Sequence, residues 1–403
     1  MATSGVRVWY NNANSAIAGS QPRERYLMLH FITGRTGSGK TAYTHKLIAD
    51  YVGEESGSAV LIVPEQYTFF CERALLEKLG PARMARAEVL SFTRLAENCL
   101  EKEGKAPAVR LDNSAKAVLM SLALEDVGER LDIYAKHSFS PSFIREMLDT
   151  VSELKKNGVS AAILDETASS LDEGTLRRKL RDLSLVAGAY EARLAAGGSD
   201  EDSLLPALCD LLLEKPLFRG AVIFLDAFSG FTGQELQVIE RLLVSASVVY
   251  VTLCTDILYP LPVDQSIFAN IRQTALKLTE IANRNNVRIA KPWMLSSGNK
   301  YNNFPLTLQR YDVAELAALE AGLFNPAARV FETRPGAVTL TQASSIQDEC
   351  DYVAREIKKM LREGAMRCRD ITVIARSKQV YEQHLVDAFR KYGIPVFADN
   401  RQP

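Results

Sequence analysis

The sequence predicts an α/β protein in which a phosphate-binding loop joins a strand to a helix. Residues 34–41 read Gly-Arg-Thr-Gly-Ser-Gly-Lys-Thr and follow an apolar segment. Strand-like and helix-like stretches then alternate, which predicts a parallel sheet with helices on its faces. From about 112 to 198 the pattern is helical only, which predicts an all-helical insertion into the α/β domain.

The loop at 34–41 has residue types that suit phosphate. Glycines permit a tight backbone with positive φ whose amides turn inward, Lys40 reaches the β- and γ-phosphates, and the Thr41 hydroxyl ligates Mg²⁺. An ordinary glycine-rich turn is the alternative. The apolar segment 27–33 before the loop and the helical spacing after Lys40 favour the phosphate loop. The predicted ligands are therefore a nucleotide and Mg²⁺, and the predicted nucleotide-binding residues are Gly34, Arg35, Thr36, Gly37, Ser38, Gly39, Lys40 and Thr41.

The order of elements supports one α/β domain interrupted by helices. Short apolar runs bounded by turn residues predict strands at 27–33, 59–63, 87–90, 221–226 and 248–254. Amphipathic stripes with helical spacing fill 112–198, and a Gly-Gly-Ser-Asp turn marks the return to the sheet. The predicted α/β domain therefore comprises 28–111 and 199–290.

A second α/β unit is predicted near the end of the chain. Residues 291–335 are rich in Pro, Asn and Gly, which predicts a linker. Alternation then resumes at 336–403, with predicted strands at 338–341, 371–375 and 394–397. The chain stops as this unit gets under way, so we expect it to be truncated.

Bulk properties exclude several classes of protein. The chain has 403 residues, room for two or three domains, and a net charge of -1, so DNA contact would need local basic patches. Its six cysteines form no Cys-x-x-Cys pair, which argues against a zinc or iron–sulfur site and against a disulfide framework. The apolar run 242–253 is interrupted by serines, so no membrane span is expected. A reducing cytoplasmic setting fits best.

The N-terminal residues 1–27 are predicted to be a disordered leader. They are polar, rich in Asn and Ser, and lack the basic-then-apolar layout of a signal peptide. Met28 stands immediately before the first strand. We therefore expect the natural start to be Met28.

Asp226 is the predicted second half of the nucleotide site. A carboxylate at the carboxyl end of a strand near a phosphate loop holds Mg²⁺, usually through water. An Asp in a strand-to-loop turn is the alternative. Motor ATPases usually carry a water-activating Glu next, but Ala227 follows here, which puts hydrolysis in doubt. Glu235 is the nearest acidic substitute, yet with Thr232 it forms a capping box, the interpretation we favour.

Two basic clusters lie on predicted helices among acidic residues. Solvated faces are the favoured interpretation, and phosphate contact by one cluster stays open. No histidine has a metal-ligand spacing. The clusters are Arg177, Arg178, Lys179 and Arg181, and Lys358, Lys359 and Arg362.

Together the ordered motifs resemble the N-terminal part of the B subunit of the AddAB-type ATP-dependent helicase–deoxyribonuclease, which is related to superfamily 1 helicases. The resemblance spans about 28–403. It rests on the loop at 34–41, Val63-Pro64-Glu65-Gln66, Ser91-Phe92-Thr93-Arg94-Leu95, the helical insertion, residues 224–232 with Gln234-Glu235, and Gly393-Ile394-Pro395-Val396-Phe397.

The resemblance implies domain identities. Residues 28–111 with 199–290 would form a RecA-like helicase domain (1A-like), 112–198 a 1B-like subdomain, and 336–403 the start of a 2A-like domain. By the same analogy Arg376 matches an arginine aimed at the γ-phosphate. A surface residue at a strand end is an equal alternative for Arg376.

The resemblance also implies a function. The family's B subunit acts in a heterodimer with a motor subunit, on duplex and single-stranded DNA, in processing double-strand breaks for recombinational repair. Its C-terminal nuclease domain carries a cysteine-bound iron–sulfur cluster, and we expect neither in this fragment. Two hypotheses follow: an ATP-binding helicase–nuclease subunit with weak or no turnover, or a non-hydrolysing DNA-recognition scaffold. A small-molecule kinase is a weaker third.

Overall fold

The computed structural model describes two compact units, divided between residues 312 and 313, and each is described by itself. Residues 1–26 of the predicted leader and 296–312 of the predicted linker lie outside the described residues. The described residues are 27–53, 57–106, 110–135, 140–259, 264, 266–295, 313–325, 328, 330–332, 336–364 and 366–396.

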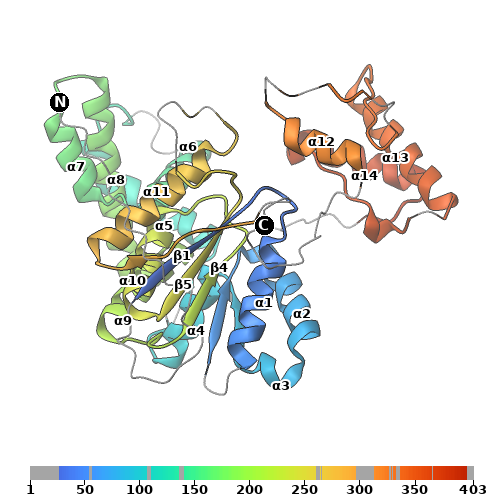
Figure 1. Cartoon of the computed structure of the whole chain (residues 1–403). Coiled ribbons are helices and arrows are strands. Elements are labelled where there is room, and N and C mark those ends of the chain that lie inside the picture. Colours follow the sequence, from blue (N-terminus) through green and yellow to red (C-terminus); the bar gives the residue numbers. More distant parts are fainter. Residues whose placement is uncertain are drawn as a thin grey trace, which may run out of the picture. The chain divides into compact units, whose positions relative to one another are not determined.

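A parallel sheet forms the centre of the first unit (Figure 1), which confirms the predicted α/β class. The strand order is β3-β2-β4-β5-β1-β6, and β7 also pairs with β1. Strands β2 and β4 are buried along their whole length, as expected where helices cover both faces. The strands are β1 (Met28–Thr33), β2 (Ala59–Ile62), β3 (Ala87–Leu90), β4 (Val222–Leu225), β5 (Val248–Leu253), β6 (Arg288–Ile289) and β7 (Trp293–Met294).

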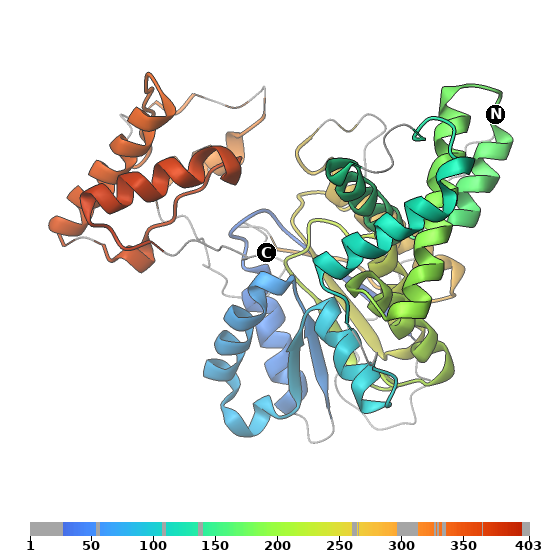
Figure 2. The same ribbon diagram turned by 180° about the vertical axis from the view of Figure 1, so that it is seen from behind.

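Helices cover the two faces of this sheet (Figures 1 and 2). Side chains alternate along each strand, so Leu61 of β2 packs with α1 and α2, while Val60 and Ile62 pack with the opposite layer. One layer comprises α1 (Lys40–Gly53), α2 (Thr68–Leu79) and the short α3 (Pro81–Met84), with the 3₁₀ turn Glu65–Tyr67 before α2. The other comprises α4 (Phe92–Lys102), α9 (Leu204–Glu214), α10 (Gly233–Ser245) and α11 (Ala269–Arg284).

The described residues between 112 and 198 are mainly helical and have a hydrophobic core of their own. Side chains from all four helices meet in it, among them Met120, Met147, Leu164 and Tyr190. Lys155, near the end of one helix, donates to buried Asp200 at 2.9 Å, next to the 3₁₀ turn Glu201–Ser203 that leads back to the sheet layers. The helices are α5 (Asn113–Val127), followed by the 3₁₀ turn Gly128–Arg130, α6 (Pro141–Lys156), α7 (Ala161–Ser170) and α8 (Thr175–Gly197).

The second unit contains α12 (Ala314–Gly322), α13 (Ile346–Arg362), the 3₁₀ turn Cys368–Asp370 and α14 (Lys378–Tyr392). Its small core joins α13 to α14 through Ala354, Ile357 and Phe389, among others.

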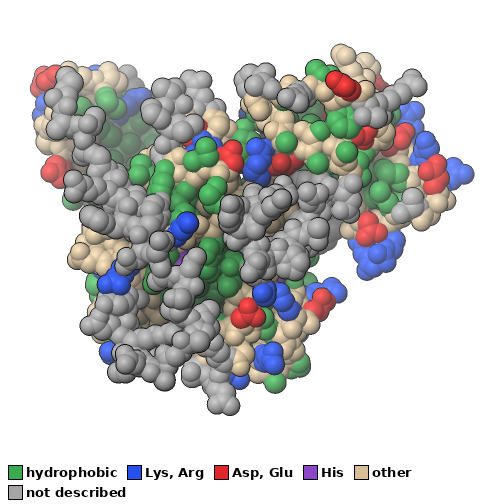
Figure 3. Space-filling model, viewed as in Figure 1, with side chains coloured by type: hydrophobic (Ala, Val, Ile, Leu, Met, Phe, Trp, Pro, Cys, Tyr) green, Lys and Arg blue, Asp and Glu red, His purple; other side chains and the backbone are tan. Residues whose placement is uncertain are grey.

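The face of the protein shown in Figure 3 carries basic and acidic side chains interspersed, in keeping with the net charge of -1.

The strands predicted for the second unit are wrong in the part that the structure describes. Residues 338–341, 371–375 and 394–396 carry no strand pairing. Leu340 is 100% exposed and Ile374 90% exposed. Apolar, β-branched composition makes a strand only where a neighbouring strand is present, and these segments pair with none among the described residues, although Ile371 and Ile394 pack against the unit's core. In the first unit, the sequence missed β6 and β7, because two-residue strands show no periodicity.

Candidate functional site

The site lies at the carboxyl edge of the sheet, where β1, β4 and β5 end together. Thr33 at the end of β1 pairs with Leu253 of β5, and Leu225 of β4 pairs with Val251 of β5. Asp226, directly after β4, therefore stands beside Thr252. With β5 between β1 and β4, the loop at 34–39 and Asp226 are two strand spacings apart, roughly 10 Å.

The loop between β1 and α1 needs its glycines. Gly37 and Gly39 have φ values of 78° and 87°, in the left-handed region that favours glycine. A Cβ on Gly34 would stand 2.6 Å from the Leu295 carbonyl oxygen. Each of the three glycines therefore has a steric reason in the loop.

Lys40 folds back over this loop. Its ammonium donates to the carbonyl oxygens of Gly34 at 2.8 Å and Arg35 at 2.9 Å. The Ser38 amide donates to the Arg35 carbonyl at 3.2 Å, which tightens the same turn. Thr41, in the first turn of α1, is exposed. A cation on a long side chain and a solvent-facing hydroxyl thus stand where a helix begins, the usual place for an anion.

Asp226 is buried, with 2% of its surface exposed, and only one of its oxygens is satisfied. Oδ1 accepts hydrogen bonds from the Ala227 amide at 2.9 Å and from the Thr252 hydroxyl. Oδ2 is buried and has no hydrogen-bond partner among the described residues. A desolvated carboxylate oxygen without a donor is costly, and it suits a water molecule held by a metal ion.

Other unpartnered polar atoms lie on the elements around Asp226. The side-chain oxygens of Thr33, Ser38 and Thr44 and the Nε2 atom of His45 are buried without a hydrogen-bond partner in the described part of the chain. Burial lowers the pKa of His45, while the charge of Asp226 opposes that shift, so the field of Asp226 reaches α1. The residues therefore fit a polar ligand together with its water.

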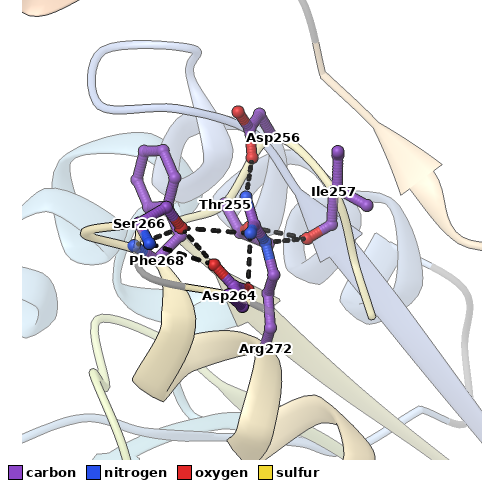
Figure 4. A network of polar contacts seen from close by, with 7 residues as sticks. All are labelled: Thr255, Asp256, Ile257, Asp264, Ser266, Phe268 and Arg272. Atoms are coloured by element: carbon purple, nitrogen blue, oxygen red, sulfur yellow. Dashed lines mark hydrogen bonds and ion pairs between the residues drawn. The ribbon is translucent and has the colours of Figure 1, made fainter. Parts of the chain in front are cut away.

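A second cluster at this edge is fully paired (Figure 4). Arg272 of α11 has a side chain only 3% exposed, and it donates to Asp264 and Asp256, both at 2.6 Å. It also donates to the Thr255 hydroxyl, the Ile257 carbonyl and the Ser266 hydroxyl. The network ties the segment after β5 to α11.

This network reaches the loop through Phe268. The Arg35 guanidinium lies 5.3 Å from the centre of the Phe268 ring, and the Arg272 guanidinium lies 5.8 Å from it. The sequence motifs did not single out Arg272 or Phe268. The available signal was an arginine at an apolar position of α11, in register with Ala275 and Leu278.

The structure also describes two further residues of the sequence analysis, Glu235 and Arg376. Glu235 accepts from the Thr232 amide at 2.7 Å while the Thr232 hydroxyl accepts from the Glu235 amide, which confirms the capping box. Arg376 is exposed and belongs to the second unit, so its contact with a γ-phosphate stays a prediction.

A ready-made metal cluster is absent from the described residues, where no three His, Cys, Asp or Glu side chains converge on a metal position. A Mg²⁺ ion at the loop would accordingly depend on Asp226, the Thr41 hydroxyl, water and the ligand's own phosphates.

No helix in the described residues is both long and apolar enough for a bilayer span.

Comparison with known proteins places these motifs in a family. A family model described as ADDB, N-terminal, matches residues 31–320, which include the loop, Asp226 and Arg272. The B subunit of the ATP-dependent helicase/deoxyribonuclease of Thermoanaerobacter pseudethanolicus is 32% identical over 372 residues, 92% of this chain and 32% of that protein. The protein of the same name from Ruminiclostridium cellulolyticum is 32% identical over 378 residues, 93% of this chain and 32% of that protein.

The chain therefore spans about a third of the length of the curated relatives it matches. The family model covers more than half of the chain and includes the whole phosphate-loop edge of the sheet. These matches show that the chain belongs to the AddB family and corresponds to its N-terminal region.

Proposed function

We propose that this chain is the ATP-binding, helicase-like part of a helicase–nuclease subunit that processes DNA double-strand breaks for recombinational repair. One observation supports it most: a glycine-rich loop with Lys40 and a half-satisfied Asp226 share one sheet edge. The relatives are named as one subunit of a helicase/deoxyribonuclease, so the proposal includes a heterodimer with a motor subunit, acting in the cytoplasm on duplex and single-stranded DNA.

The residues at this edge divide the work of holding Mg²⁺·ATP. Free backbone amides of the loop would donate to the phosphates, and the Lys40 ammonium, which now donates to the Gly34 and Arg35 carbonyls, would donate to phosphate oxygens instead. Thr41 and Asp226 would hold the Mg²⁺ ion, which would neutralise phosphate charge. In this proposal, 112–198 is the 1B-like subdomain, 336–403 begins the 2A-like domain, and Arg376 completes the site at the γ-phosphate.

Turnover is expected to be weak. Ala227 offers no carboxylate to activate water, and the capping box already engages the Glu235 side chain and amide. The site would then bind ATP for regulation, with the partner subunit supplying most of the motor. The same two observations favour the second candidate, a non-hydrolysing scaffold for DNA recognition.

ATP binding tests the proposal directly. Lys40→Ala should weaken binding of a fluorescent ATP analogue by roughly 10- to 100-fold, because a charge-assisted contact is worth about 1.5–3 kcal/mol. Lys46→Ala is the matched control, since Lys46 is exposed on the same helix. Equal affinity of wild type and Lys40→Ala would refute the nucleotide site.

The same variant separates the two candidates. DNA-stimulated ATP turnover that Lys40→Ala abolishes would support the ATP-using subunit. Nucleotide binding without turnover, in the presence of the partner subunit and DNA ends, would support the scaffold.

A further inference from the structure

The second unit has a hollow of about 530 Å³ that is rich in positive charge. Four cations, one carboxylate and one aromatic ring surround it. The lining residues are Arg355, Lys358, Lys359, Arg362, Glu363 and Tyr392.

Helix geometry explains why the four cations meet. They follow one another on α13 with i, i+3, i+4 and i+7 spacing, which puts them on one face, about 10 Å from first to last. Ala354 and Ile357 are buried on the core side of the same helix. Tyr392 reaches the hollow from the end of α14.

These cations lack ion-pair partners. In the described part of the chain, no carboxylate lies within ion-pairing distance of any of the four, and none of the four side chains makes a hydrogen bond. Elsewhere in the unit, Lys391 pairs with Asp351 at 2.7 Å and Arg390 pairs with Asp387 at 3.2 Å. Like charges at i,i+4 repel one another on a helix, and an anion bound at this face would relieve that repulsion.

The position on the helix narrows the kind of anion. The hollow lies over the C-terminal half of α13, where the backbone offers carbonyl oxygens and no free amides. A compact phosphate group would find no cradle of backbone donors there. Four cations spread along about 10 Å instead suit a row of phosphates, which in a stacked strand follow one another at about 3.4 Å.

We propose that this hollow binds the phosphate backbone of single-stranded DNA. The choice of DNA rests on the proposed function, whereas the anion site rests on the charges themselves. Lys359 and Arg362 are the variants of choice, because both side chains line the hollow from the last turn of α13.

The test is the salt dependence of binding of a fluorescent oligo(dT) strand to the full chain. Lys359→Ala with Arg362→Ala should weaken binding at least tenfold. It should also lower the slope of log Kd against log salt by about 1.4, because each lost phosphate contact removes about 0.7. Alanine has a high helix propensity, so α13 should stay helical in this variant, and circular dichroism checks the helix content.

A matched control removes two charges elsewhere. Lys179 and Arg181 are also helix cations, on α8, and they line no part of the hollow. Lys179→Ala with Arg181→Ala should change affinity less than twofold and leave the slope unchanged. If both double variants lost the same affinity for the strand, the loss would follow from net charge alone and the proposal would be overturned. Absence of strand binding by the wild-type chain would overturn it too.

Two further arms separate this inference from the nucleotide site. Lys40→Ala should keep strand binding, and the Lys359/Arg362 variant should keep ATP binding. If the second variant loses the ATP analogue but not the strand, the ligand is a free nucleotide and the strand assignment fails. If Lys40→Ala keeps ATP binding while the hollow variant loses DNA, the proposed function fails and the hollow stands.

Discussion

Two buried charges stand at the same edge of the first unit's sheet, and they differ in how fully the protein satisfies them. Arg272 donates to two carboxylates and to three neutral acceptors, so its guanidinium is surrounded by partners. Asp226 uses one oxygen for an amide and a hydroxyl, and its other oxygen is buried without a donor among the described residues.

The difference indicates what each charge is for. A buried ion whose partners all come from its own chain holds the architecture, here the segment between β5 and α11. A buried ion that is half satisfied costs stability, which is reasonable only where a ligand completes it. Mutation should therefore reverse the pattern: loss of Arg272 costs folding, and loss of the Asp226 charge costs binding.

Arg272→Ala should give the largest effect on stability. The substitution removes the ion-pair partner of Asp264 and of partly exposed Asp256. It also removes the guanidinium that donates to the Thr255 hydroxyl. Breaking a buried pair costs about 3–5 kcal/mol, and solvent access at Asp256 argues for the lower end, roughly 3 kcal/mol. Urea unfolding followed by circular dichroism measures it.

A double variant sharpens this prediction. Arg272→Met with Asp264→Asn removes both members of the more buried of the two ion pairs, so part of the lost stability should return. If Arg272→Ala changed the free energy of unfolding by less than about 0.5 kcal/mol, the range of ordinary surface positions, the network would contribute nothing to stability.

The sequence predicted the loop because its signal is local. Residues 34–41, the strand before them and the helix after them lie within one short stretch of chain. Asp226 was predictable because it directly follows a buried strand. Its unpaired oxygen was not, because the partners that a side chain lacks are a property of the tertiary structure.

The Arg272 network shows the opposite case. Its acids lie 8 and 16 positions before Arg272 in the chain, with no motif to join them. Pattern also failed in the second unit, where 371–375 has strand composition but no neighbouring strand in the described part of the chain. On α13, the sequence showed a basic cluster but not which cations pair, which decides between a solvated face and a site.

His30 offers a third way to handle a buried ionisable group, which is to keep it neutral. The ring stacks on Tyr250 and packs against Trp293, with centroid distances of 5.0 and 5.1 Å. Burial lowers the pKa of His30 to about 4, from 6.5. The contribution of His30 to the free energy of unfolding is therefore full above pH 6.5. It falls between pH 6.5 and about 4, because the unfolded chain takes up the proton first.

The expected loss from His30 is about 2 kcal/mol at pH 5, smaller than that of Arg272→Ala. His30→Phe keeps an aromatic ring in the stack, so unfolding free energies between pH 7.5 and 4.5 should fall less steeply in the variant. Burial lowers the pKa of His45 too, so some slope should remain. Parallel slopes in wild type and variant would mean that His30 has the same pKa in the folded and the unfolded chain, which would contradict the prediction.

Asp226→Asn should have the smallest effect on stability and the most selective effect on binding. The amide oxygen still accepts from Ala227 and Thr252, and the amide nitrogen takes the place of the unpaired oxygen without its buried charge. We expect the free energy of unfolding to change by no more than about 1 kcal/mol.

Ligand-linked unfolding then separates the two kinds of buried charge. Saturating Mg²⁺·ATP, at about 100 times Kd, should raise wild-type stability by about 2.7 kcal/mol. In Asp226→Asn, ATP should stabilise the chain equally with Mg²⁺ or with EDTA, because the metal has lost its protein carboxylate. Suppose instead that Asp226→Asn costs as much stability as Arg272→Ala and keeps its Mg²⁺ dependence. The half-satisfied carboxylate would then be architecture like the other charge, since a metal site cannot lose its charged ligand and keep its metal response.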